Sequence, residues 1–304
     1  MLSFIRVANV RVRTRQHWIG WDDGGGGRRY YPIQVQIRRE TTLLHTGHWD
    51  RAAAVAAQNL AEAEQSGLDR DIANCRYNLA GFRARFGDFE SALLLYGLAR
   101  DHYARTGNRV SEHLAIWNIG SIHWEQGDGG QAMGCYRRSL AVFLEAGLHR
   151  EAAILMGEMG KILAARGERR QAEEQYARAI RLSRERGNLR SLADALNNAA
   201  GTALDGGDHQ AALAMFQEAL ELNRKMGDLR GQAFDFGMIG EIALKTGSTD
   251  QALASFERVL AIRLEINDAP GAEQARGQIG RIRAALGPRA SIKPTARQRC
   301  NRRS

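Results

Sequence analysis

The side chains best placed to start a metal site lie near the beginning of the chain. His45 and His48 are three residues apart and Asp50 follows them, so these residue types and this spacing suit a metal ion. No HExxH motif and no further ligand at a suitable spacing follows. We therefore interpret the group as a solvated turn and expect no metal site.

The sequence also contains no motif typical of a catalytic or cofactor-binding site. His113 and His123 fall within one expected helix, and no Cys or Ser nucleophile is positioned beside them. The sequence has no GxxxxGK(S/T) loop, and the glycines at 24–27 lack the strand–turn–helix setting that a dinucleotide loop needs. We expect no enzyme activity and no cofactor.

The cysteines and the N-terminus indicate a reducing compartment. Cys75, Cys135 and Cys300 are an odd number without CxxC or CxxH spacing, which argues against a disulfide framework and a structural zinc ion. The apolar start, residues 1–5, is too short for a secretory signal. Nothing suggests a membrane span, and we expect a cytoplasmic protein.

Positive charge is concentrated at the two ends of the chain. The net charge is +9, of which residues 1–39 carry +6 and residues 288–304 carry +6, so that the middle carries −3. We expect residues 1–31 to be a disordered basic leader with a glycine linker, and 288–304 to be a disordered basic tail. An organellar transit peptide and a misplaced start codon are alternatives for the leader. Nucleic-acid binding through the tails is a further alternative, which the lack of interleaved aromatic residues disfavours.

An internal repeat predicts the secondary-structure elements that would position any functional site. Glycines recur at a strict spacing of 40 residues, and a second series falls half a period away. The first series is Gly47, Gly87, Gly127, Gly167, Gly207, Gly247 and Gly287; the second is Gly67, Gly107, Gly147, Gly187 and Gly227, closed by Asn267. Gly and Asn accept the left-handed conformation that ends helices. Each period therefore predicts two helices and two stops.

Other columns of the repeat support close helix packing. Five residues after each of the first six glycines stands an alanine, as at Ala172, and four residues further an aromatic residue, as at Tyr176, stands in five of the six repeats. Seven residues before each glycine from Gly87 onward is Ala or Gly, as at Gly160. Offsets of three and four keep such columns on one helical face. No proline occurs between Pro32 and Pro270, as uninterrupted helices require.

These columns resemble the signature of tetratricopeptide repeats, clearly over residues 72–287 and weakly over 40–66. The chain departs from the family in lacking its Trp, Tyr and Pro positions, and its period of 40 exceeds the common 34. The resemblance implies an all-α, right-handed superhelical solenoid of about six helix-turn-helix repeats plus a C-terminal capping helix. The expected boundaries are 32–71, 72–111, 112–151, 152–191, 192–231 and 232–271, with the cap at 272–287.

The same resemblance implies what the protein does. The period is similar to that of the long-repeat branch found in kinesin light chain, in polarity adaptors, in Rap regulators and in sensor regions of large bacterial transcription regulators. It implies a non-enzymatic adaptor or regulatory scaffold that binds a protein or peptide in a concave groove lined by the first helices. The alternatives are a detached sensor region of a bacterial regulator and a scaffold whose Arg-rich tails bind nucleic acid. Oligomeric state is left open.

Side chains expected in the groove are aromatic, amide and mixed-charge. The two indoles of Trp117 and Trp124 are seven residues apart and share one face to within about 20°, so we expect an aromatic anchor, with packing between helices as the alternative. Amides suit an extended backbone because they donate and accept, although they also simply solvate a surface. The expected groove residues are Tyr77, Asn78, Arg85, Trp117, Asn118, Trp124, Lys161, Asn197 and Asn198.

A recurrent arginine follows the half-period glycines by three residues. Arg70, Arg150, Arg190 and Arg230 form this column. A basic binding stripe is one interpretation. We favour a structural role, because the column falls between helix termini, where carbonyl groups and acidic side chains are available.

Overall fold

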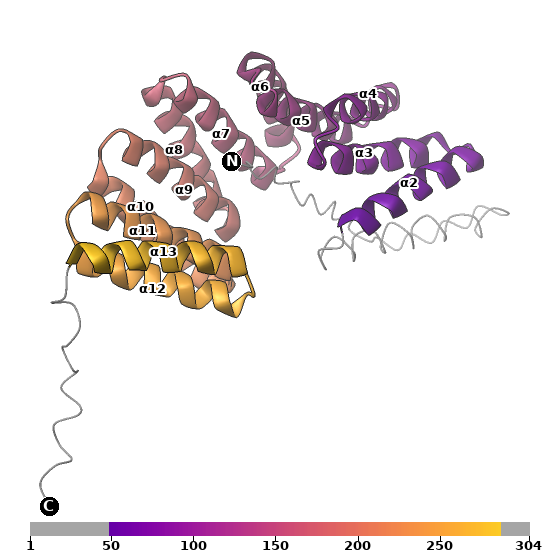
Figure 1. The fold of residues 1–304 in the computed structure, drawn as a ribbon. Coiled ribbons are helices and arrows are strands. Elements are labelled where there is room, and N and C mark those ends of the chain that lie inside the picture. The colour runs from indigo at the N-terminus through magenta and orange to yellow at the C-terminus, as the bar shows by residue number, and fades with distance from the viewer. Residues whose placement is uncertain (1–48, 287–304) are drawn as a thin grey trace, which may run out of the picture. The chain divides into compact units, whose positions relative to one another are not determined.

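A computed structural model describes residues 49–286, and all of its regular elements are α-helices (Figure 1). The first helices of the repeats are α3 (Asp69–Arg85), α5 (Arg109–Glu125), α7 (His149–Ala165), α9 (Leu189–Asp205), α11 (Leu229–Lys245) and α13 (Ala269–Leu286). The second helices are α2 (Trp49–Ser66), α4 (Phe89–Arg105), α6 (Gly129–Glu145), α8 (Arg169–Glu185), α10 (His209–Met226) and α12 (Thr249–Glu265). Each first helix from α3 to α11 packs against the second helix that follows it. The all-α repeat fold expected from the sequence is confirmed.

The chain divides between Leu148 and His149 into two compact parts. The N-terminal part comprises α2 to α6, and the C-terminal part comprises α7 to α13. The expected leader at 1–31, the start of the first repeat at 32–48 and the tail at 288–304 lie outside the described residues, as do His45, His48, Gly287 and Cys300.

Helix ends are set by a glycine followed by a capping residue. Every described member of the two 40-residue series has a positive φ, from 56° at Asn267 to 85° at Gly127, which confirms the predicted stops. The next residue often starts the next helix: Asp228 follows Gly227 and accepts a hydrogen bond from the backbone N–H of Gly231 at 3.0 Å. Such a cap satisfies one of the free N–H groups of the first turn. First helices therefore begin about three residues before the repeat boundaries expected from the family pattern.

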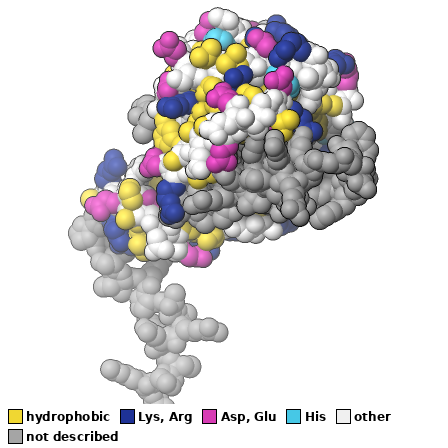
Figure 2. All heavy atoms as spheres, turned by 90° about the vertical axis from the view of Figure 1, so that its right-hand side faces the viewer, with side chains coloured by type: hydrophobic (Ala, Val, Ile, Leu, Met, Phe, Trp, Pro, Cys, Tyr) yellow, Lys and Arg dark blue, Asp and Glu magenta, His cyan; other side chains and the backbone are white. Residues whose placement is uncertain are grey.

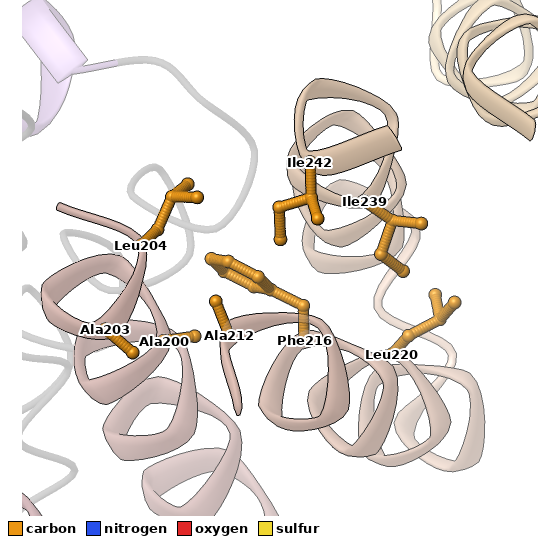
Figure 3. Close-up of a cluster of buried hydrophobic side chains, with 8 residues drawn as sticks. All are labelled: Ala200, Ala203, Leu204, Ala212, Phe216, Leu220, Ile239 and Ile242. Carbon is orange, nitrogen blue, oxygen red and sulfur yellow. The ribbon is translucent and has the colours of Figure 1, made fainter. Parts of the chain in front are cut away.

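The core of each repeat is formed around the aromatic column. In the C-terminal part the ring of Phe216, on α10, is fully buried between side chains of α9 and α11 (Figure 3). Leu204 and Ala200 contribute from α9, and Ile239 and Ile242 contribute from α11. A second helix thus packs against two consecutive first helices, which joins neighbouring repeats through apolar burial.

The last described helix continues this scheme. Pro270 occupies the second position of α13, where its missing N–H costs no intrahelical hydrogen bond. Ala275, Ile279 and Ile282 of α13 are buried against Phe256 and neighbouring side chains of α12. These contacts cover the apolar side of α12, as expected of a closing helix.

An ion pair ties consecutive first helices in the C-terminal part. Arg190, in the first turn of α9, donates through Nη1 to Oδ2 of Asp228, the N-cap of α11. Its counterpart Arg230 lies near Asp268, the equivalent acid at the start of α13, and helps to lower the pKa of that carboxyl, to which the backbone hydrogen bond from Gly271 contributes most. These contacts agree with a structural role for this arginine column.

Candidate protein-binding face

Two of the expected groove residues of the N-terminal part, Tyr77 and Asn118, are hydrogen-bonded to each other. Nδ2 of Asn118 donates to Tyr77 Oη at 2.8 Å, and to the carbonyl oxygen of Leu114 at 3.0 Å. The Tyr77 ring packs edge-on against Tyr96, with centroids 5.3 Å apart. Burial raises the pKa of the Tyr77 hydroxyl to about 12, and the bond from Asn118 partly opposes that shift. Tyr77 and Asn118 therefore bridge α3 and α5.

Trp117 does not lie on an exposed face. Its side chain is only 4% exposed, and its ring packs edge-on against Phe143 of α6 with centroids 5.9 Å apart. The expectation that both indoles face a groove is therefore wrong for Trp117. The alternative, packing between helices, is what the structure shows for this residue. An indole gains more from burial against another aromatic ring than from exposure to water.

Other expected residues of the N-terminal part are half-buried. These include Trp124, seven residues beyond Trp117, and Asn78 on α3. The guanidinium carbon of Arg85 stands 3.6 Å from the ring centroid of Trp49, a cation–π contact between α3 and α2. Trp124 is thus the partly accessible member of the expected tryptophan pair.

In the C-terminal part the expected residues lie on α7 and α9. Lys161 Nζ is 2.9 Å from Glu158 Oε1, a pair on the surface of α7. Asn198 Nδ2 lies 3.5 Å from the position that a Cβ atom on Gly157 would occupy, which places this amide of α9 beside α7. Both asparagines of α9, Asn197 and Asn198, are half-buried.

Asn197 belongs to a polar cluster that the sequence did not indicate. On α10, Asn223 donates through Nδ2 to Oδ2 of the fully buried Asp235, on α11, at 2.6 Å. The side chain of Asn197 also acts on this carboxyl and helps to lower its pKa. Three helices therefore meet at one buried carboxyl group.

Phe234 was also missed, although its position carries a signal. This side chain of α11 is 48% exposed, and its ring stands edge-on to Phe216 with centroids 6.2 Å apart. Phe234 falls in the second column of the first helices, one of the columns that line the concave face in the family. Comparing this second column with the columns that hold the asparagines would have identified Phe234 from the sequence.

Two glycines on the first helices α9 and α11 are not required by close packing. A Cβ atom on Gly201 or Gly237 would meet no atom within 4 Å, whereas one on Gly160 would meet Tyr176 at 2.4 Å. Glycine inside a helix costs about 1 kcal/mol relative to alanine. Gly201 of α9 and Gly237 of α11 therefore leave the helix backbone open to close approach from outside.

The charge of the described surface is mixed. Figure 2 shows basic and acidic side chains interspersed with apolar ones over the visible face. Among residues 49–286, no group of three or more His, Cys, Asp or Glu side chains is arranged to hold a metal ion. No helix in the same range has the length and apolar character needed to cross a bilayer.

Comparison with known families identifies the repeat. The family model described as tetratricopeptide repeat matches residues 112–185 and 191–265. The chain is a tetratricopeptide repeat protein. The repeat formed by α3 and α4, before the matched segments, buries the same small and aromatic columns: Ala80, Ala92, Tyr96 and Ala99.

Solved structures share the fold of this tetratricopeptide repeat protein. BtubC (BKLC) from P. vanneervenii is 19% identical with a TM-score of 0.53, over 84% of this chain and 96% of that one. A Rap protein in complex with competence and sporulation factor is 13% identical with a TM-score of 0.59, over 84% and 86%. A STAND protein with a tetratricopeptide repeat sensor, from Pyrococcus horikoshii, is 12% identical with a TM-score of 0.68, over 84% and 39%. No curated protein matches the sequence.

Proposed function

We propose that the protein is a non-enzymatic adaptor or regulatory module that holds a polypeptide segment against the exposed faces of its first helices. Its fold is that of repeats which typically bind proteins, and the related Rap protein was solved with competence and sporulation factor bound. We place it in a reducing, cytoplasmic environment, in which Cys75 and Cys135 are free thiols.

The observation that carries this proposal is the half-exposed Phe234 on a first helix of the C-terminal part. A large aromatic side chain gains free energy when a partner covers it, which is why such residues act as anchors. Gly237 lies one turn further along α11 and leaves room for a backbone to approach. Asn197 and Asn198 of the neighbouring repeat supply groups that donate to and accept from a backbone.

The residues expected from the sequence divide into two roles in this proposal. Within the C-terminal part, Lys161, Asn197 and Asn198 contact the bound segment directly. Asn78 and Trp124 offer contacts of the same kind within the N-terminal part, taken by itself. Tyr77, Asn118 and Arg85 fix the spacing between helices through the contacts described above. Trp117 acts only through the core.

A photo-crosslinking amino acid at position 234 tests the proposal in cells. We expect a discrete crosslinked protein from position 234, and none from position 264. Leu264 is a matched control because it is 51% exposed in the same part but lies on a second helix, α12. Equal crosslinking from both positions, or from neither, would contradict binding on the first helices.

A second candidate is the sensor region of a larger regulatory system. The STAND protein, described as having a tetratricopeptide repeat sensor, supports this candidate with a TM-score of 0.68. If it is correct, the protein crosslinked at position 234 is encoded beside this chain and carries a catalytic or DNA-binding domain. An unrelated crosslinked protein without such a domain would favour the adaptor.

A further inference from the structure

Asp235 is an exception within its own repeat column. Residues at this position in the other described repeats are buried and apolar: Cys75, Ala115, Leu155, Ala195 and Ala275. Asp235 is as deeply buried as these residues, with a side chain that is 0% exposed. A carboxyl group is not needed here to build a repeat, and departures from a local folding rule concentrate at functional sites.

The surrounding structure makes specific room for this carboxyl. The buried Asn223 donates to its Oδ2 at 2.6 Å. A Cβ atom on Gly231 would lie 2.6 Å from Cγ of Asn223, so the absence of a side chain at Gly231 allows the amide to enter. Gln232 Nε2 also donates to the carbonyl oxygen of Asn223 at 3.4 Å. α10 and α11 thus hold one side of the carboxyl in place.

The other side of the carboxyl is left incomplete. Oδ1 of Asp235 and Oδ1 of Asn197 are both buried, and neither accepts a hydrogen bond from the described residues. Two buried acceptors without a donor are costly. A proton on Asp235 Oδ1 converts this acceptor into a donor, for which the amide oxygen of Asn197 is a suitable acceptor once the amide has turned.

Charges around the cluster favour the protonated acid. Asp194 of α9 and Asp228 at the N-cap of α11 both raise the pKa of Asp235, while Asn223, the contact from α10, is neutral. Arg190 of α9 pairs with Asp228 and offsets part of its charge. Burial is the largest cause of the shift, the hydrogen bond from Asn223 and the nearby side-chain amide of Asn197 oppose it, and the resulting pKa is about 6.

The protonation state determines how Asn197 is oriented. An ionised Asp235 accepts from Nδ2 of Asn197, which turns the amide oxygen away from the acid. A protonated Asp235 donates to Oδ1 of Asn197, which turns Nδ2 away from the acid instead. We propose that Asp235 takes up a proton in the folded protein and thereby reverses the hydrogen-bonding group that Asn197 presents to a bound segment. The predicted effect on binding rests on the proposed function of this face. The protonation of Asp235 and the turn of the Asn197 amide do not depend on that function.

Nuclear magnetic resonance on the full chain tests the local exchange without a partner. We expect the carboxyl carbon of Asp235 to titrate with a midpoint near pH 6, and the side-chain amide signals of Asn197 to shift with the same midpoint. The amide of Asn118, in the other part, is the internal control. A midpoint near pH 4, or an Asn197 amide that does not follow Asp235, would overturn the proposal.

Two variants make the assignment specific. Asp235→Asn retains a neutral side chain with a donor, so the Asn197 signals should become independent of pH. Asp194→Asn removes a neighbouring negative charge and keeps the cluster, so the midpoint should move to lower pH. An Asn197 transition that persists in Asp235→Asn assigns the proton to another group and overturns the proposal.

Binding is the second measurement, made with a peptide from the protein crosslinked at position 234. We expect its affinity to change at least about fivefold between pH 5 and pH 8 in the wild type, a typical size of coupling between two sites, and to be constant in Asp235→Asn. Binding that is equal at both pH values in the wild type would overturn the reversal while leaving the proposed function intact. Absence of any crosslinked protein would instead reject the proposed function. The magnetic resonance titration would still show whether Asp235 takes up a proton and whether the Asn197 amide responds to it.

Discussion

Gly160 of α7 and Tyr176 of α8 lie so close together that a Cβ atom on the glycine would be 2.4 Å from Cε1 of the tyrosine ring. Overpacking a core usually costs about 1–3 kcal/mol, and alanine regains about 1 kcal/mol of helix propensity over glycine. We therefore predict that Gly160→Ala destabilises the protein by a net amount of up to about 2 kcal/mol. Denaturant unfolding followed by circular dichroism measures the difference.

Gly237→Ala is the matched control for that substitution. A Cβ atom on Gly237 would meet nothing within 4 Å, so we predict a gain of about 0.5–1 kcal/mol from helix propensity alone. If Gly160→Ala also increases stability, the Tyr176 ring has room to move and close packing does not explain the glycine.

The two tryptophans of α5 are predicted to behave differently. Trp117→Ala removes a side chain that is 4% exposed and packed on Phe143, so it should lower stability by about 3–5 kcal/mol. Trp124→Ala removes a half-buried side chain and should cost about 1 kcal/mol.

Partner binding by the folded variants gives the second comparison. We expect Trp124→Ala to weaken binding about tenfold, as loss of an aromatic anchor does. Unchanged binding by Trp124→Ala would exclude it as an anchor. An unchanged unfolding free energy for Trp117→Ala would contradict its burial.

The fold was predictable because its signals are local and repeated. A glycine such as Gly87 ends one helix by its own backbone conformation, and the neighbouring Asp88 caps the next helix by accepting from the N–H of Ser91 at 3.2 Å. Both effects depend on adjacent residues, and the 40-residue period shows each of them several times. Pattern alone therefore locates the helices.

The site was less predictable because it depends on contacts between helices. Trp117 and Trp124 share a helical face, but Phe143 of another helix decides which of them is buried. Asp235 meets Asn223 and Asn197 only after three helices have packed. Helical periodicity places a residue on a face and does not specify what covers that face.

Asp228 is predicted to stabilise the C-terminal part in two ways. It caps α11 through Gly231 and pairs with Arg190. Asp228→Ala loses both contacts and should cost about 1–2 kcal/mol, whereas Asp228→Asn keeps the cap and should cost less than 1 kcal/mol. Equal costs in urea unfolding at pH 7 would show that the cap contributes nothing separate from the charge.

The pH dependence of Asp228 has a definite sign. Burial raises the pKa of its carboxyl, but the hydrogen bond from Gly231 and the contact with Arg190 outweigh burial, and the pKa is lowered. Its contribution is therefore complete above the ordinary pKa of 3.8 and is lost as the pH falls below that value. The difference in stability between wild type and Asp228→Asn should shrink below about pH 4.

Asp235 should show the opposite dependence. Folding raises its pKa from 3.8 to about 6, so the native state holds the proton over a range in which the unfolded chain has lost it. Its contribution to stability is greatest below about pH 4, falls between about pH 4 and pH 6, and is constant above. A shift of two units corresponds to about 3 kcal/mol.

Asp235→Asn isolates this contribution, because the other carboxyl groups titrate alike in both proteins and cancel in the difference. The unfolding free energy of Asp235→Asn minus that of the wild type should rise by about 3 kcal/mol between pH 4 and pH 7 and then level off. Urea unfolding at half-unit steps of pH measures it. A difference that stays constant over this range would mean that the buried carboxyl is ionised in the folded protein throughout, with Asn223 and Asn197 supplying all the stabilisation that its charge requires.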